Sequence, residues 1–167
     1  SKNVYVKNRN NLAKELKNGS IAVIISNDVM PSNSDGTLKF KQNSDFLWLT
    51  GIAQEESILV LFPDSPDPAF KEVLFLRETN ETIAIWEGRK LTKDEAREKT
   101  GIDNIVWLSN FNNVFRNLIT DAENVYINSN EHKRAIIEVE TRAARFIKKC
   151  KDDFPLHNYY RLSPIIN

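Results

Sequence analysis

Five short, mainly apolar runs recur along the chain, and segments with helix signals separate them. The runs occupy 21–25, 57–62, 73–76, 105–108 and 125–127. Short apolar runs bounded by polar turns are typical of buried strands, and strands that alternate with helices build layered domains. We also interpret 46–49 and 83–86 as strands, the second forming a hairpin with 73–76, which argues against a purely parallel sheet. The sequence therefore predicts an α/β fold: a three-layer domain with a mixed β-sheet flanked by helices.

Helix signals fall between these runs. We expect helices over 8–17, from 92 to about 101, over 110–119, and from 129 or 130 to about 151. Asn8 and Gly19 mark the two ends of the first of these helices. Thr92 and Glu95 form a capping box, in which the hydroxyl and the carboxylate each satisfy a free backbone N–H. The polar stretch 26–39 reads as a long loop, and loops of this length often carry function.

Length and charge set the class of protein. The 167 residues, 41% of them apolar, indicate one globular domain over residues 1–167. Lys plus Arg and Asp plus Glu number 23 each, so the basic surplus of proteins that bind nucleic acid or anionic membranes is missing. No apolar run approaches the ~20 residues of a membrane span, and the lone cysteine, Cys150, fits a reducing compartment. We expect a cytoplasmic protein that binds neither nucleic acid nor membrane.

Residue types that carry catalysis are scarce. The two histidines, His132 and His157, belong to no His-Glu-x-x-His pattern, and we expect both to have ordinary surface roles. Cys150 falls on the apolar face of the last predicted helix, where burial is more common than nucleophilic reactivity. We expect the acidic pair at 55–56 to lie on the solvated surface. We therefore expect neither catalytic residues nor a metal site within this chain.

Two segments are richer in aromatic and charged residues than their surroundings. Residues 40–51 read FKQNSDFLWLTG, a polar run that leads into an aromatic stretch and stops on glycine. Residues 85–90 read IWEGRK, in which a tryptophan precedes a glycine and two cations. Each segment is explained adequately as a turn beside a partly buried aromatic side chain. Tryptophan close to arginine is also a common contact pair in binding sites, so both interpretations stay open.

Together the two segments resemble the N-terminal domain of aminopeptidase P, the Xaa-Pro aminopeptidase of the creatinase/prolidase "pita-bread" metallopeptidase family. That family carries a Phe/Tyr-Arg-Gln-x-Ser-Asp-Phe-x-Tyr-Leu-Thr-Gly segment followed by Ile-Trp-x-Gly-Arg-Arg, and both occur here in order. Lys41 and Lys90 stand where arginine is usual, and Trp48 replaces a common tyrosine. The resemblance implies the family's N-terminal fold, which contains a ribonuclease H-like motif.

The resemblance also implies a division of labour between two domains. In this family a separate C-terminal domain holds two divalent metals, usually manganese, which activate water to cleave the peptide bond before proline. This chain would then be the non-catalytic N-terminal domain of an enzyme, with both metals in the missing catalytic domain. The implied partners are that C-terminal catalytic domain, identical subunits in a dimer or tetramer, and a proline-containing peptide substrate.

In relatives this domain walls the substrate cleft and reaches the active site of a neighbouring subunit. By position, the substrate-binding residues would be Trp86, whose indole can cover apolar groups near proline, and Asp35, whose carboxylate can pair with the α-amino group. An ordinary turn at Ser34-Asp35-Gly36 is the alternative for the second residue. The residues assigned to the interface or to structure are Arg89, Gly88, Asp45 and Phe46.

Two other functions are compatible with the sequence. One is the N-terminal domain of a prolidase or creatinase relative, whose substrate is set mostly by the missing domain. The other is a non-enzymatic module of the same fold that binds peptides or histones, as in the large subunit of the FACT histone chaperone. The intact Trp86-x-Gly88-Arg89 segment and the lack of charged tails favour the peptidase.

Overall fold

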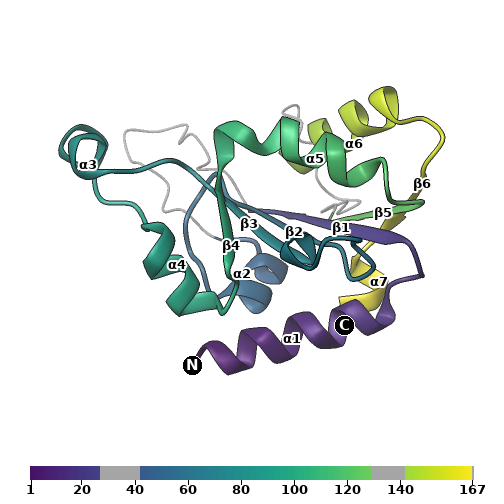
Figure 1. Cartoon of the computed structure of the whole chain (residues 1–167), viewed down its shortest axis with the longest axis horizontal. Helices are drawn as coiled ribbons and strands as arrows, with labels where there is room; N and C mark the ends of the chain where they lie inside the picture. Colours follow the sequence, from purple (N-terminus) through teal and green to yellow (C-terminus); the bar gives the residue numbers. More distant parts are fainter. Residues whose placement is uncertain (27–41, 129–141, 167) are drawn as a thin grey trace, which may run out of the picture.

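A six-stranded mixed sheet forms the centre of the molecule (Figure 1). The computed structural model describes residues 1–26, 42–128 and 142–166. The strands are β1 (Ser20–Ile25), β2 (Ile58–Leu61), β3 (Glu72–Leu76), β4 (Asn104–Trp107), β5 (Asn124–Ile127) and β6 (Asn158–Arg161). Their order across the sheet is β4-β3-β2-β1-β5-β6. The β1–β2 and β2–β3 pairs are antiparallel, whereas β3–β4, β1–β5 and β5–β6 are parallel.

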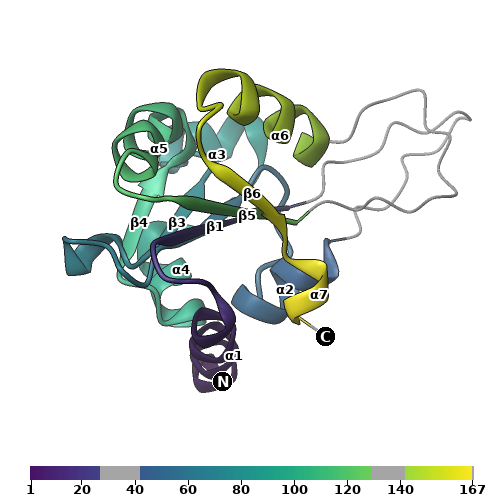
Figure 2. The same ribbon diagram turned by 90° about the vertical axis from the view of Figure 1, so that its right-hand side faces the viewer.

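Helices cover both faces of this sheet. They are α1 (Lys2–Glu15), α2 (Ser44–Thr50), α3 (Glu81–Glu87), α4 (Lys93–Thr100), α5 (Phe111–Ile119), α6 (Arg142–Asp153) and α7 (Ser163–Ile166), with 3-10 turns η1 (Pro68–Phe70) and η2 (Leu108–Asn110). In Figure 2, α5 and α6 lie on one side of the sheet and α1, α2 and α7 on the other. The predicted three-layer α/β architecture with a mixed sheet is confirmed.

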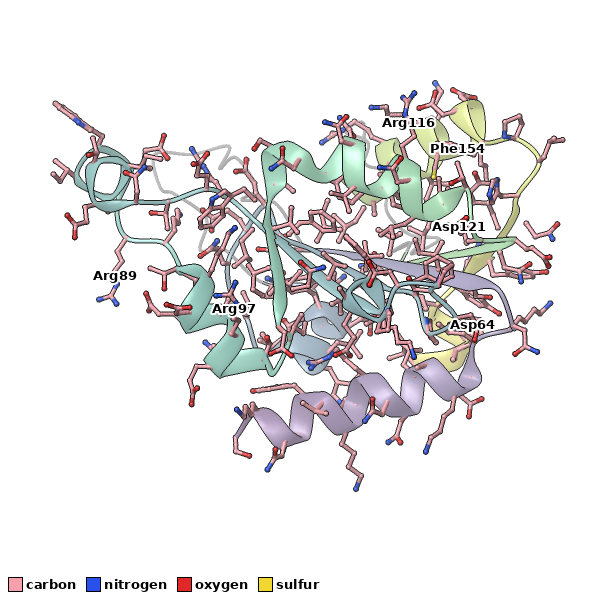
Figure 3. The ribbon with its side chains drawn as sticks, in the orientation of Figure 1. Asp64, Arg89, Arg97, Arg116, Asp121 and Phe154 are labelled. Carbon is pink, nitrogen blue, oxygen red and sulfur yellow. The ribbon has the colours of Figure 1, made fainter. Side chains whose placement is uncertain are left out.

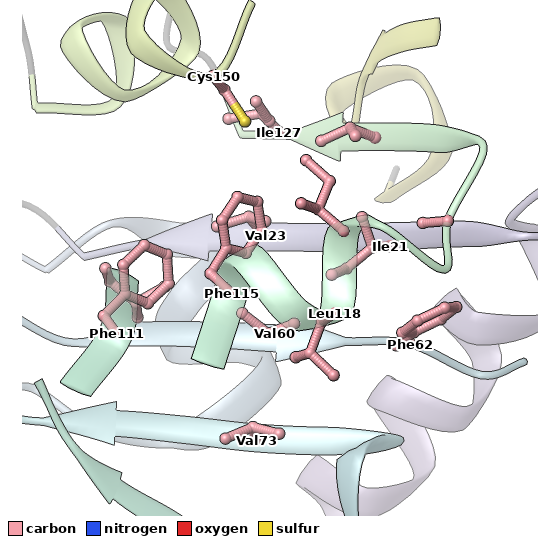
Figure 4. Packing of buried hydrophobic residues seen from close by; sticks show 14 of the residues in the cluster. Ile21, Val23, Val60, Phe62, Val73, Phe111, Phe115, Leu118, Ile127 and Cys150 are labelled. Atoms are coloured by element: carbon pink, nitrogen blue, oxygen red, sulfur yellow. The ribbon is translucent and has the colours of Figure 1, made fainter. Parts of the chain in front are cut away.

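Two apolar clusters hold the layers together. Along β1, Ile21 and Val23 point to the α5 and α6 side, whereas Ala22 and Ile24 point to the α1 side. This alternation follows from the pleat of a strand, and because both faces are covered, every residue of β1 is buried. Figure 4 shows the first cluster, in which side chains of α5 and α6 pack onto the sheet; its labelled members include Phe111, Phe115, Leu118 and Cys150.

The segment 46–49, predicted to be a strand, is helical and forms most of α2. Asn43 Oδ1 accepts from the N–H groups of Asp45 and Phe46, both at 3.0 Å, and this caps the helix. Gly51 ends the helix in the left-handed conformation, with φ of 70°. The strand prediction is wrong because a four-residue aromatic run fits either period, and the flanking cap and glycine decide between them.

The segment 83–86 is also helical and lies in α3, so the predicted hairpin with 73–76 does not exist. Asn80 Oδ1 accepts from the Ile83 N–H at 2.8 Å, and Gly88 ends the helix with φ of 85°. The sheet is mixed for a different reason: β2 runs antiparallel to both β1 and β3.

Three other predictions differ in detail or lie outside the described residues. The first helix begins at Lys2, not at Asn8, whose side chain instead donates to the Trp48 carbonyl oxygen at 2.9 Å. The start of the last long helix lies outside the described residues, as do residues 27–41 of the predicted loop.

The Thr92 cap is confirmed, since its hydroxyl accepts from the Glu95 N–H at 3.1 Å. Within the described residues, no helix is long and apolar enough to cross a membrane.

Candidate functional site

Helix α3 stands clear of the layered body at one end of the sheet (Figure 1). None of its residues is buried. Ile85 and Trp86 lie side by side in sequence and are 77% and 84% exposed. Large apolar side chains together on a protruding element are typical of contact surfaces. We call residues 77–91, which carry α3 between β3 and α4, the α3 arm.

The return of the arm to the body is fixed by two contacts with the loop before β2. Lys90 Nζ lies 2.6 Å from Glu55 Oε1, and these side chains are only 20% and 23% exposed. The next residue, Leu91, donates its N–H to Gln54 Oε1 at 3.0 Å. The hydrogen bond from Lys90 lowers the pKa of the Glu55 carboxyl below its usual value. The carboxylate is therefore charged at neutral pH and bound to the arm.

The outgoing end of the arm is fixed by a single arginine. Arg77 Nη1 lies 3.4 Å from Glu56 Oε2, and its Nη2 lies 3.0 Å from Glu87 Oε2. Because Glu87 is the last residue of α3, the guanidinium links the end of the helix to the strand from which the arm departs. Glu55 and Glu56, expected to be solvated surface, are both ion-paired. The expectation is wrong for Glu55, which is only 23% exposed, whereas Glu56 remains 42% exposed.

Two residues assigned to the interface or to structure lie within the arm. Gly88 adopts φ of 85°, a backbone conformation that residues other than glycine rarely take. A Cβ added at this position would meet nothing within 4 Å. Arg89 is 82% exposed and pairs with Glu95 at 3.2 Å. Its side chain extends below α3 in Figure 3, beside α4.

The other segment singled out from the sequence lies in the core instead of in the arm. Phe46 is fully buried in the cluster on the α1 side of the sheet. Asp45, in the first turn of α2, is half-buried, and burial raises the pKa of its carboxyl. The structure therefore places Phe46 apart from the exposed indole of Trp86. Asp35, the second predicted substrate-binding residue, lies outside the described residues, as does His132.

The remaining candidates for chemistry are occupied in packing. His157 is half-buried, and its Nε2 lies 2.8 Å from the Ile119 carbonyl oxygen, so it joins the start of β6 to the end of α5 and lacks the surface role expected. Cys150 is buried, as predicted, and burial raises the pKa of its thiol to about 11, which disfavours the reactive thiolate. Among residues 1–26, 42–128 and 142–166, no cluster of His, Cys, Asp and Glu could hold a metal ion.

A hollow of about 340 Å³ lies between α5 and α6 and was not foreseen from the sequence. Its lining includes four phenylalanines, and its charged residues are Arg116, Lys149 and Asp153. Two of its residues, Arg116 and Phe154, are labelled in Figure 3. The Phe111 and Phe115 rings stack on each other with centroids 5.2 Å apart, so much of the aromatic surface already packs within the core. The α3 arm is the better candidate for a functional surface.

Comparison with known proteins gives a consistent match. The family model described as "Aminopeptidase P, N-terminal domain" matches residues 5–126. The Xaa-Pro aminopeptidase of Escherichia coli is 31% identical over 148 residues, which cover 89% of this chain and 33% of that protein. Human Xaa-Pro aminopeptidase 3 is 28% identical over 106 residues, which cover 62% of this chain and 21% of that protein. The chain thus spans a third or less of the length of these relatives.

Solved structures agree with the sequence comparisons. The low-pH form of aminopeptidase P from E. coli superposes with a TM-score of 0.75 at 26% identity, over 99% of this chain and 38% of that chain. The structure of Pseudomonas aeruginosa aminopeptidase PepP gives a TM-score of 0.74 at 22% identity, over 96% of this chain and 36% of that one. The mixed sheet and its helical layers are therefore shared with these proteins.

Proposed function

The chain belongs to the family of aminopeptidase P N-terminal domains, and from this premise we propose that it is the non-catalytic N-terminal domain of an Xaa-Pro aminopeptidase. The parent hydrolase would remove the N-terminal residue that precedes proline. Its two divalent metals, manganese in this proposal, would be held by a C-terminal catalytic domain. The protein would work as a cytoplasmic homo-oligomer, in which this domain assists assembly and walls the substrate cleft.

The observation that carries the proposal is the exposed indole on the α3 arm. Trp86 makes little contact with its own domain, being 84% exposed at the end of a protruding helix. A large aromatic side chain gains most by being covered, because it can bury ~150–250 Å² of surface. In the proposed enzyme it would be covered on reaching the active site of a neighbouring subunit, where it would lie over the proline side of the peptide. Asp35 would bind the α-amino group of the same substrate.

Removal of the indole tests this role. In the protein that joins this domain to its catalytic domain, we expect Trp86→Ala to raise KM or lower kcat about tenfold, the effect of losing roughly 1.4 kcal/mol of contact. Trp48→Ala is the matched control, since Trp48 is also a surface tryptophan but lies on α2, at 39% exposure. Peptide kinetics that Trp86→Ala leaves unchanged would rule out the substrate-covering role.

Two further measurements separate the alternatives. Hydrolysis of Xaa-Pro dipeptides but not of longer Xaa-Pro-Xaa peptides would identify a prolidase instead of an aminopeptidase. Binding of histone peptides by the isolated chain, with no metal-dependent hydrolysis in the parent, would identify a binding module.

A further inference from the structure

Three consecutive residues in the loop before β2 each hold a different point at the base of the α3 arm. These residues, Gln54, Glu55 and Glu56, are called the clamp. Their partners, in the same order, are the Leu91 N–H, the Lys90 ammonium and the Arg77 guanidinium. The joined residues are 37, 35 and 21 positions apart in the sequence, in the same order. The clamp therefore fixes both ends of the arm from one short segment.

The backbone of the clamp has an uncommon conformation at Glu56. Within the described chain, Glu56 is the one non-glycine residue with a positive φ, 55°. A glutamate in the left-handed region is uncommon, and such strain persists where the surrounding contacts determine the conformation. Here the neighbouring carboxylates of Glu55 and Glu56 reach partners at opposite ends of the arm, Lys90 and Arg77.

Outside the clamp, the arm is attached only near its ends, where Thr79 is buried and Leu91 packs against the cluster on the α1 side, and α3 itself has little to hold it. Helix α3 contains seven residues, none of them buried, and helices this short are marginal without tertiary contacts. Arg77 adds a second tie, because it pairs with Glu87 at the end of the helix as well as with Glu56. Trp86 directly precedes Glu87, so these ion pairs act next to the exposed indole.

We propose that the clamp sets the direction in which α3 projects and so positions Trp86, with Arg77 as the principal positioning residue. The functional consequence of this inference rests on the proposed role of Trp86. An arm held in one direction loses little conformational freedom on docking, and such preorganisation strengthens contact without adding new interactions. The clamp itself touches no substrate.

Hydrogen exchange of the 167-residue chain tests the clamp independently of activity. We expect Arg77→Gln to speed amide exchange in the 80–91 segment about fivefold, which is the upper range for loss of exposed ion pairs, while β1 and β2 stay protected. Arg97→Gln is the matched control: Arg97 is also 40% exposed and ion-paired, to Asp94 within α4. Glu56→Asn is a second variant that suits the left-handed backbone but cannot reach Arg77, and it should speed exchange in the same segment. Unchanged exchange of 80–91 in both Arg77→Gln and Glu56→Asn would overturn the proposal.

A double-mutant cycle in the protein with its catalytic domain tests the link to Trp86. We expect Arg77→Gln to lower kcat/KM about threefold in the otherwise natural chain, since small displacements of a positioned group reduce the rate. In the Trp86→Ala background the same substitution should have no further effect, because the clamp would have no indole left to position. Independent, additive effects would overturn the positioning role. If Trp86→Ala alone leaves the kinetics unchanged, the substrate-covering role fails, and the exchange experiment still decides whether the clamp orients the arm.

Discussion

Arg9 shows how one side chain joins elements that are distant in sequence. Its fully buried guanidinium donates to Glu72 Oε2 at 2.7 Å, to the Leu49 carbonyl oxygen at 2.9 Å and to the Thr100 carbonyl oxygen at 2.7 Å. The two carbonyls belong to the last turns of α2 and α4, where a positive charge also complements the helix dipole. Helix α1 is thereby bound to two other helices and to β3.

We predict that Arg9→Met destabilises the chain by about 3 kcal/mol, because two buried carbonyls and a carboxylate lose their donor. The free energy of unfolding in urea, followed by circular dichroism, measures the change. Arg9→Lys should recover only part of the loss, since a single ammonium cannot reproduce the fork of the guanidinium. A cost of Arg9→Met below about 1 kcal/mol would show that the network contributes little.

Individual residues also show which parts of the site the sequence could predict and which it could not. Trp86 and Gly88 could be selected because they lie in a segment that resembles a known family. Glu55 and Glu56 could not, because an acidic pair in a loop looks the same whether it is solvated or paired with Arg77 and Lys90 far along the chain. Contacts of this kind depend on the fold and leave no periodic signal.

At the scale of elements, the five mainly apolar runs are strands as predicted, whereas the two aromatic runs at 46–49 and 83–86 are helical. The runs at β1 and β2 are buried on both faces, so nothing competes with the strand interpretation. Helices α2 and α3 are each seven residues long and contain aromatic side chains that would also suit a strand. Only their asparagine caps and terminal glycines distinguish them from strands. Strand β6 was missed because its sequence, NYYR, is polar at both ends and lies at the sheet edge beside β5 alone.

The terminal glycines of α2 and α3 give a matched test of these helix ends. Both have positive φ, but a Cβ at Gly51 would overlap the Tyr5 ring, whereas one at Gly88 would lie in open space. We predict that Gly88→Ala costs about 2 kcal/mol, because φ of 85° with ψ of 166° lies in a region that residues other than glycine hardly visit. Gly51→Ala should cost about 3 kcal/mol, since overpacking against Tyr5 adds to the smaller strain of its left-handed backbone. Thermal unfolding measures both, and equal losses would contradict the argument from space.

At the scale of the whole molecule, one sheet is shared by two apolar clusters, and helix α3 contributes to neither. The neighbouring residues Val73 and Leu74 of β3 are both fully buried, but they face opposite clusters. Loss of packing on either face should therefore weaken the same sheet. The exposed side chains of Ile85 and Trp86, in contrast, can change without cost to the fold.

This separation predicts which substitutions alter stability. Val73→Ala and Leu74→Ala should lower the free energy of unfolding by about 2 and about 3 kcal/mol, each within a single cooperative transition. Trp86→Ala should change it by less than about 0.5 kcal/mol, as expected for an exposed side chain without packing partners. Urea unfolding of the three variants, followed by both circular dichroism and tyrosine fluorescence, measures these values. Two separate transitions would show that the clusters fold independently, and a large loss in Trp86→Ala would show that the indole serves the fold of its own domain instead of a contact beyond it.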